Sequence, residues 1–537
     1  MPQMTRMARE PRRLHGATFV LFAALAVLHS WPLATNPARL ARLDNHDAEL
    51  NTWIIAWVPH AMATNPLGLF DAPIFHPERH ALAFSEHMFV PSMIGAPLIW
   101  AGVSPVLVYN LLIMLGFALS GLAMYWVMRE WTGSTWAALA AGLAYAFNAH
   151  VLTRFAHLQA MHVEFFPIAI YAFDRVLHHQ KARDALLLAA AFVLQGLSSN
   201  HLLVFTTYAL TACAVVRWRE LKPGASRLAL AATVAVIALL PFLWPYYQVD
   251  REHGLARTAD VVTQYNAGWR DYLVTAGRLH YAWWSHRFYE GRTALFPGVT
   301  VLTVSGFALL AGPGLGHPRI RMAAAVAVLG AALSFGTALP GYALLHETLP
   351  LLSGIRSVAR WGWLVLAAAA MLVGFGVAAL EATKRPAWRT AAAVLCVLIT
   401  VEAIRAPVGY TPFNGIPRIY DRLAGQPAVV AEFPFYSGAT VSNNGRYVLA
   451  NTRYFKPLLN GYSGFHPASF MERGRALEGF PDECAIAELR SAQVTTVVVH
   501  VAAFNDWYGS DRLEAVEASA ALELVAEDEG IRLYRVR

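Results

Sequence analysis

Long apolar runs are the feature that most restricts what this chain can fold into. A helix needs about 20 mostly apolar residues to span the hydrocarbon layer of a bilayer. Eleven runs approach or meet this requirement: 16–34, 105–128, 134–148, 161–177, 184–199, 201–216, 226–244, 296–312, 321–337, 361–381 and 387–405. They predict a polytopic α-helical membrane protein with about 11 transmembrane helices. Segment 89–101 is shorter and contains Pro91 and Pro97, so it is a re-entrant or tilted element, or a twelfth span.

The composition excludes several other classes of protein. Only 14% of the 537 residues are charged and 56% are hydrophobic, whereas soluble proteins are about a quarter charged. Disorder requires low hydrophobicity, and three cysteines are too few for a disulfide scaffold. The chain lacks both GxxxxGK[ST] and GxGxxG, which argues against an ATP-driven pump and a nucleotide-sugar enzyme with a dinucleotide-binding domain.

The basic residues indicate the orientation in the membrane. With the N-terminus inside, the short basic turns MREWTG, RVLHHQKARD, RWRELKPGASR, HPRIR and EATKRPAWR all fall on the cytoplasmic side. The net charge of +7 is therefore interpreted as membrane topology, and no nucleic-acid partner is expected. Arg12 and Arg13 precede a first run that is long for a signal peptide, which favours an uncleaved anchor. A bacterial-type inner (plasma) membrane is the expected location.

The tail differs from the rest of the chain in composition. Residues 1–405 are predicted to form the transmembrane domain, with outer loops 35–88 and 245–295, and residues 406–537 a small extracytoplasmic α/β domain. Strand-like runs PAVVAEFPF and TTVVVHVA flank the helical pattern DECAIAELRSA. The final LELVAEDEGIRLYRVR predicts two strands around a turn at Glu529-Gly530.

Three acids, Asp44, Asp47 and Glu49, follow the first apolar run directly. Acids in a membrane protein are costly unless solvated and are functional candidates by default, although a water-exposed polar loop is the alternative. Trp53 and Trp57 then lie one helical turn apart, as in a helix at the membrane interface.

This arrangement resembles the GT-C superfamily of membrane glycosyltransferases. Its mark is a pair of acids, adjacent or one apart, in the first non-cytoplasmic loop, and Asp47-Ala48-Glu49 matches the spaced form. The stretch LFDAPIFHPERHALAFSEH, the order of spans and the outer tail extend the resemblance. It implies an inverting enzyme that moves a sugar from a polyprenyl-phosphate donor to a lipid, glycan or protein acceptor.

The resemblance also suggests roles for the three acids. Asp47 is the expected catalytic base, because a carboxylate can accept the proton of the attacking group. Asp44 is the second candidate. Glu49 positions the acceptor or a divalent metal, in which case Asp47 and Glu49 hold Mg²⁺ or Mn²⁺, ions that suit hard oxygen ligands. Members of the family differ in metal dependence, so the sequence leaves this open.

Other polar residues at the predicted outer side are candidates for substrate binding. They are Glu86, His87, His150, His157, Gln159, Arg356 and Arg360. His150 and His157 are two helical turns apart and Arg356 and Arg360 are four residues apart, so each pair is expected on one helical face. Arginine pairs well with phosphate. Asn200 and His201 are expected at the same level.

For each of these groups an ordinary role at the membrane interface is the alternative. Glu86 and His87 can snorkel to the headgroups, and the arginines can simply meet lipid phosphates. Zinc is a further alternative for His150, His157 and His162, although no HExxH spacing supports it. The aromatic and arginine-rich loop 245–295 is expected to cover the substrate.

Two rival functions stay open. A lipid-linked glycan flippase or transporter predicts charges deep inside spans and inverted repeats, and the chain shows no repeat. A non-enzymatic membrane assembly protein that displays the tail is the third possibility, against which the large first loop argues.

Overall fold

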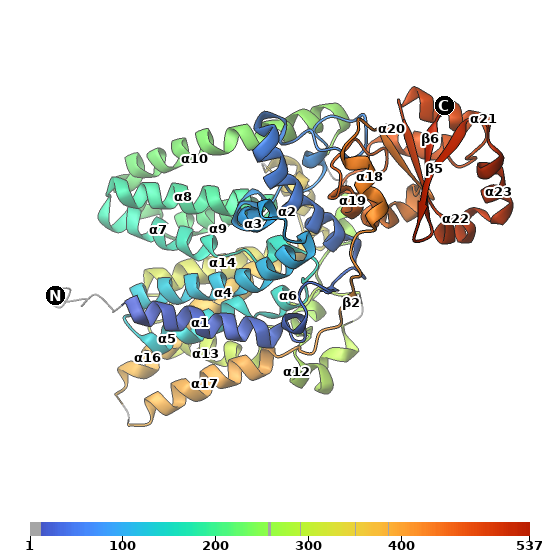
Figure 1. Cartoon of the computed structure of the whole chain (residues 1–537). Coiled ribbons are helices and arrows are strands. Elements are labelled where there is room, and N and C mark those ends of the chain that lie inside the picture. Colours follow the sequence, from blue (N-terminus) through green and yellow to red (C-terminus); the bar gives the residue numbers. More distant parts are fainter. Residues whose placement is uncertain (1–11, 256–258, 290, 350, 385) are drawn as a thin grey trace. The chain divides into compact units, whose positions relative to one another are not determined.

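The computed structural model describes residues 12–537 except 256–258, 290, 350 and 385, and it is mostly helical (Figure 1). Each of the eleven apolar runs lies largely on one helix. These are α1 (Arg12–His29), α4 (Pro105–Thr132), α5 (Thr135–Ala146), α7 (Phe165–His179), α8 (Ala182–Ser198), α9 (Asn200–Val216), α10 (Trp218–His253), α13 (Val299–Leu310), α14 (Pro318–Ser334), α16 (Trp363–Ala382) and α17 (Trp388–Ala403). Segment 89–101 forms the separate short helix α3 (Phe89–Trp100).

These helices differ in whether they are long enough to cross a membrane. Within the described residues, three helical stretches are long and apolar enough to cross a membrane: Pro105–Thr132, Trp218–His253 and Val358–Ala382. Gly16–His29, Asn200–Val216 and Val299–Leu310 are apolar but shorter. The helical nature of the runs is confirmed, whereas the number that span the membrane stays a prediction.

Contacts divide the chain into two compact units. Unit 1 comprises Met1–Asn36, Leu111–Pro241 and Ala256–Gly409, and unit 2 comprises Pro37–Asn110, Phe242–Leu255 and Tyr410–Arg537. By contacts the first loop is therefore grouped with the tail. The predicted separate domain of residues 406–537 stays a prediction.

Helix α16 is the centre of unit 1. It packs against α5, α13 and α14, and fourteen of its twenty residues are buried. Its sequence is rich in alanine and glycine, which allow helix backbones to approach closely. A side chain on Gly374 would collide with Met128, and one on Gly376 would collide with the carbonyl oxygen of Val304. Small residues on α16 are therefore a packing requirement.

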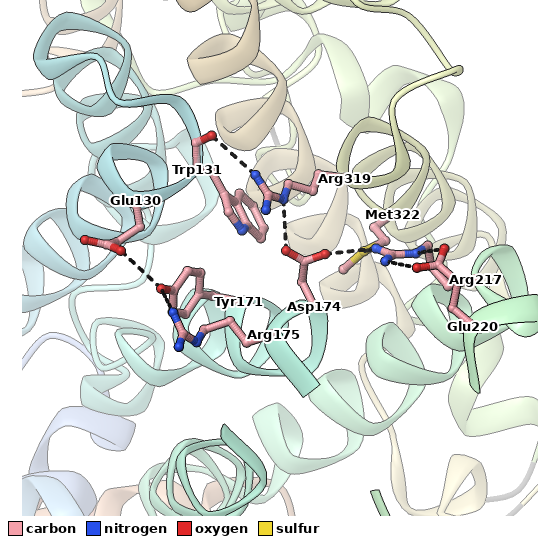
Figure 2. Close-up of polar contacts among 9 residues, drawn as sticks. All are labelled: Glu130, Trp131, Tyr171, Asp174, Arg175, Arg217, Glu220, Arg319 and Met322. Carbon is pink, nitrogen blue, oxygen red and sulfur yellow. Dashed lines mark hydrogen bonds and ion pairs between the residues drawn. The ribbon is translucent and has the colours of Figure 1, made fainter. Parts of the chain in front are cut away.

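A buried charge network ties several helices of unit 1 together (Figure 2). Asp174 on α7 is 1% exposed and accepts hydrogen bonds from Arg217 Nη1 and Arg319 Nε, each at 2.9 Å. Arg217 also pairs with Glu220 at the start of α10, and Arg319 Nη1 donates to the carbonyl oxygen of Trp131 at 3.3 Å. Asp174 is thus a compensated structural charge.

Unit 2 contains a four-stranded sheet in the order β3-β4-β6-β5. Strand β3 (Val430–Phe433) pairs in parallel with β4 (Thr496–His500), and the hairpin of β5 (Leu522–Asp528) and β6 (Ile531–Val536) completes the sheet. Glu529 and Gly530 have φ values of 49° and 74°, as a two-residue hairpin turn requires. The predicted hairpin is therefore confirmed. The helices of the tail are α18 (Asp421–Ala424), α19 (Gly445–Asn451), α20 (Ala468–Ala476), α21 (Glu483–Ser491), α22 (Val501–Tyr508) and α23 (Ser510–Ala518).

The side chains of Trp53 and Trp57 point into the protein and not towards a membrane surface, while the interfacial position of their helix stays a prediction. Both lie on α2 (His46–Thr64), which packs against α3 and α19, and both are buried inside unit 2. Trp53 Nε1 donates to Asn451 Oδ1 at 3.2 Å, and Trp57 Nε1 donates to the carbonyl oxygen of Leu69 at 2.9 Å. The indole N–H groups thus find partners within the protein, so neither ring needs the wet interface.

Candidate functional site

The acidic cluster lies at the beginning of α2 in unit 2. Asn45 caps this helix, since its side chain accepts a hydrogen bond from the backbone N–H of Asp47 at 2.9 Å. Asp47 and Glu49 occupy the first turn, where negative charge favours helix formation. Asp44 precedes the cap.

Each of the three acids has a different partner. Arg42 donates to both oxygens of Asp44, at 2.8 and 2.9 Å, and the Asp44 side chain is half exposed. The Tyr462 hydroxyl donates to Asp47 Oδ1 at 2.7 Å. Asp47 is itself half-buried.

Glu49 belongs to a separate contact. It is 6% exposed, and its Oε2 lies 2.8 Å from His46 Nδ1. Residues two apart on a helix do not share a face, so Asp47 and Glu49 offer no common side to a cation. The described residues also contain no cluster of three or more Asp, Glu, His or Cys side chains able to hold a metal. The geometry gives the Mg²⁺ or Mn²⁺ prediction no support.

Glu86 and His87 also belong to unit 2. The Tyr246 hydroxyl donates to the carbonyl oxygen of Ser85 at 2.8 Å and lies 3.1 Å from His87 Nδ1, which must therefore donate to it. Burial lowers the pKa of His87 to about 4, and the charge of Glu86 opposes this shift. His87 is a neutral buried residue with Nε2 as an acceptor, so snorkelling is wrong for it.

Four of the predicted substrate-binding residues line one pocket inside unit 1. The space between its walls, open solvent included, is about 440 Å³. His150, His157, Gln159 and Arg360 line it together with His201, and the remaining lining residues are Arg154, Ala160, Val163, Ser199, Leu202, Phe205 and Trp363. We call this the basic pocket.

A tight turn builds one wall of the basic pocket. Helix α6 covers only Ala149–Leu152, and the chain then turns, with the backbone N–H groups of Thr153 and Arg154 donating to the carbonyl oxygens of His150 and Val151 at 3.2 and 3.0 Å. His157 follows outside this helix, just before the 3-10 turn Leu158–Ala160. The expected common helical face of His150 and His157 is therefore wrong, yet the turn brings both to the pocket.

Basic side chains line the pocket. Arg154 and Arg360 are among its lining residues, and within the described chain no carboxylate lines it. Burial, and then the charges of Arg154 and Arg360, hold the pKa of His150 well below its ordinary value. His150 is thus neutral, and its buried Nδ1 has no hydrogen-bond partner among the described residues. Two guanidinium groups and the neutral His150 imidazole suit a phosphate ligand.

Arg356 does not share this site. Arg360 lies in the 3-10 helix Val358–Gly362, which begins after Arg356. The common helical face expected for Arg356 and Arg360 is therefore wrong. Arg356 is exposed, does not line the basic pocket, and lies over the Tyr265 ring with 5.3 Å between its Cζ and the ring centroid.

His162 does not join His150 and His157 as the third ligand of a zinc site. His162 is buried with Nδ1 at 3.1 Å from Glu164 and Nε2 at 3.1 Å from the carbonyl oxygen of Leu112. It does not line the pocket that contains His150 and His157.

Sequence reasoning missed several residues of these sites. Arg154 had one usable indication, because it is the sole basic residue in the predicted outer turns 149–162 and 198–201. Phe205 and Trp363 look like ordinary residues of apolar runs. Tyr462 lies 415 residues beyond Asp47, and nothing local connects the two.

Comparison with known proteins identifies the fold. No family model and no curated protein matches this chain. The solved structure of arabinofuranosyltransferase AftD from Mycobacteria matches 98% of the chain with a TM-score of 0.62 and 16% identity, and the match covers 40% of AftD. ArnT from Cupriavidus metallidurans matches over 98% of both chains, with 14% identity and a TM-score of 0.42.

The likeness to AftD concerns the fold, since identity is low and the chain spans less than half of AftD's length. The predicted helical fold is therefore confirmed in its coarse form, as an architecture that the chain shares with AftD, whereas the number of spans and the separate tail domain stay predictions.

Proposed function

We propose that this chain is an inverting GT-C glycosyltransferase. It moves a sugar from a polyprenyl-phosphate donor to a lipid, glycan or protein acceptor on the periplasmic face of the membrane. The observation that carries the proposal is the basic pocket, which combines Arg154, Arg360 and the buried neutral His150 and has no carboxylate among its described lining residues. The GT-C fold gives this pocket its context.

The basic pocket receives the donor phosphate. When the bond between the anomeric carbon and the phosphate oxygen breaks, the electron pair leaves with the phosphate, which gains negative charge. Fixed guanidinium groups stabilise that charge as it develops and lower the barrier. His150, His157 and Gln159 supply hydrogen bonds that orient the phosphate or the sugar.

Asp47 is the proposed base. The acceptor oxygen or nitrogen attacks the anomeric carbon from the side opposite the phosphate, which inverts that centre, and its proton passes to the Asp47 carboxylate. Two observations favour Asp47 over its neighbours. Asp44 is already bound through both oxygens by Arg42, and Glu49 is buried against His46. Tyr462 orients Asp47.

Asp47→Asn tests the assignment, because it keeps the size of the side chain and removes the base. With purified full-length protein and a panel of polyprenyl-phosphoryl pentose and hexose donors, we expect transfer to fall about 10²- to 10⁴-fold. Donor binding should persist, because the basic pocket is unchanged. Transfer by Asp47→Asn at the wild-type rate would refute the assignment.

The same preparation separates the rival functions. A flippase would move the labelled donor across a vesicle membrane without joining its sugar to an acceptor. An assembly protein would neither transfer the sugar nor bind the donor, and Arg360→Gln would then change nothing.

A further inference from the structure

Helix α12 (Arg278–Trp283) in unit 1 turns most of its surface outwards. His280 is its one buried residue, whereas Leu279 is 39%, Tyr281 41% and Trp283 67% exposed. Single exposed apolar side chains are ordinary, but several large ones close together indicate a contact with a partner or a membrane. We call Leu279, Tyr281 and Trp283 the α12 patch.

The fold holds this helix firmly. The backbone N–H of Arg278 donates to the carbonyl oxygen of Ile404 at 2.8 Å, and Arg278 Nε donates to the carbonyl oxygen of Ala406 at 2.5 Å. On the inner side, the ring of Trp284 lies 4.7 Å from that of His280. These contacts tie α12 to the C-terminal end of α17 (Figure 1), so the fold itself determines which side chains face outwards.

Helix α17 indicates what surrounds this end. Val394, Val397, Leu398 and Val401 are between 42% and 60% exposed and follow helical spacing, so they form one apolar stripe. Such a stripe on a predicted span suits contact with lipid tails. In the topology predicted from the sequence, the C-terminal end of α17 is its outer end. Helix α12 is therefore attached at the level of the outer headgroups.

The residue types of α12 and its surroundings suit the headgroup layer. Trp and Tyr gather at this level, because their rings are apolar while their N–H or O–H group reaches water. Residues 272–289 include Arg278 and Arg287 and no acid, and Arg287 is exposed. An arginine at this level can pair with a lipid phosphate. Both the apolar patch and the positive charge therefore favour a lipid surface as the partner.

Covering the substrate is the alternative role for the loop 245–295. Among its described lining residues, however, the basic pocket has none from this loop. We propose that α12 anchors the protein in the outer leaflet: the α12 patch lies among the lipid headgroups, with Arg287 beside their phosphates. The proposal rests on the predicted membrane location and not on the glycosyltransferase function.

Spin labels measure the depth of α12 in the membrane. Full-length protein is reconstituted into vesicles of phosphatidylethanolamine and phosphatidylglycerol. The collisions of one nitroxide with oxygen, which concentrates in lipid, are compared with those with a water-soluble nickel chelate. Ala282→Cys places the label on the exposed side of α12, and Cys484→Ser removes the exposed cysteine, so that the remaining two are buried. Wild-type protein labelled at Cys484 is the reference for water, and Val397→Cys with Cys484→Ser is the reference for lipid.

We expect the label at position 282 to collide more with oxygen than with the chelate, to a smaller degree than the label at Val397. The label at Cys484 should show the opposite preference. Changing Leu279 and Trp283 to serine should reverse the preference at position 282, and Arg287→Gln should increase collisions with the chelate there. Trp507→Ser is the matched control, because Trp507 is 47% exposed in the tail, and it should change nothing.

Three results would overturn the proposal. The label at position 282 could behave like that at Cys484, which places α12 in water, or collide with neither reagent, which means that protein covers it. The serine and glutamine variants could leave the preference at position 282 unchanged. Should a variant not fold, the label at position 282 in the otherwise unchanged chain still decides. Preference for the chelate at Val397 would overturn the predicted membrane location and this proposal with it. Sugar transfer is not measured, so failure here leaves the proposed enzyme activity to its own test.

Discussion

Replacing Asp174 with asparagine is the sharpest test of how unit 1 is held together. Its carboxylate lies between Arg217 and Arg319 at 2.9 Å from each (Figure 2). Asparagine has the same shape, but it carries no charge and presents an N–H₂ group in place of one oxygen. Two guanidinium groups then lose their shared counter-charge inside the protein.

The size of the loss in stability depends on the partners that each arginine retains. Breaking a buried ion pair costs about 3–5 kcal/mol, mostly because a charge is left uncompensated. Arg217 retains Glu220, and Arg319 retains the Trp131 carbonyl and has a side chain 23% exposed to solvent. The free energy of unfolding should therefore fall at the lower end, by about 3 kcal/mol. For a unit of this size, that lowers the melting temperature by about 5 °C.

Thermal unfolding of the purified protein, followed by tryptophan fluorescence, measures this change. Asp421→Asn is the matched control, because Asp421 pairs with Arg453 at 2.6 Å but both side chains are about half exposed. Exposed pairs contribute little, so the control should melt close to wild type. In a double-mutant cycle, Asp174→Asn with Arg319→Gln should cost less than the sum of the two single changes. The reasoning is refuted if Asp174→Asn melts like the control, or if the two changes simply add.

Three further predictions concern the candidate sites. Tyr462→Phe should lower kcat about tenfold and leave the KM for donor nearly unchanged, because it removes only the hydrogen bond to Asp47. If Tyr462→Phe lowered kcat by the same factor in the Asp47→Asn protein, this reasoning would be contradicted. Arg360→Gln should weaken donor binding about tenfold or more, whereas Arg356→Gln, outside the basic pocket, should have a much smaller effect in the same equilibrium binding assay. The pKa of His87 is about 4 in the folded protein and about 6.5 in an unfolded chain. The free energy of unfolding should therefore be highest above pH 6.5 and should fall between pH 6.5 and pH 4, because only the unfolded state takes up the proton in that range. His87→Gln should make melting temperature less dependent on pH across that window, and an unchanged pH profile would show that His87 is not responsible.

Local patterns in the sequence predicted the elements correctly. Each apolar run lies largely on one helix, because a helix satisfies its backbone hydrogen bonds within itself where the surroundings offer no polar partner. The β5–β6 hairpin was predictable for a similar reason, since Glu529-Gly530 and the flanking alternation are all local.

Tertiary packing decided which side chains meet. Trp53 and Trp57 carry an interfacial pattern, but the partners of their N–H groups, Asn451 and the Leu69 carbonyl, come from elsewhere in the chain. The common helical faces expected for His150–His157 and Arg356–Arg360 are not formed, because the helix that contains His150 ends at Leu152 and the 3-10 helix that contains Arg360 begins only at Val358. Spacing alone does not reveal such interruptions.

The sequence by itself determined the helical architecture, the hairpin of the tail, and the residue types that a phosphate or a base would need. Only the tertiary structure decided that His150, His157, Gln159 and Arg360 share a pocket with Arg154, that Arg356 does not, and that Tyr462 orients Asp47. The physical reason is the distance along the chain over which the stabilising contacts act. Helices and tight turns are fixed by neighbours along the chain, whereas a pocket requires side chains from distant helices, whose positions depend on contacts such as those of the small residues on α16.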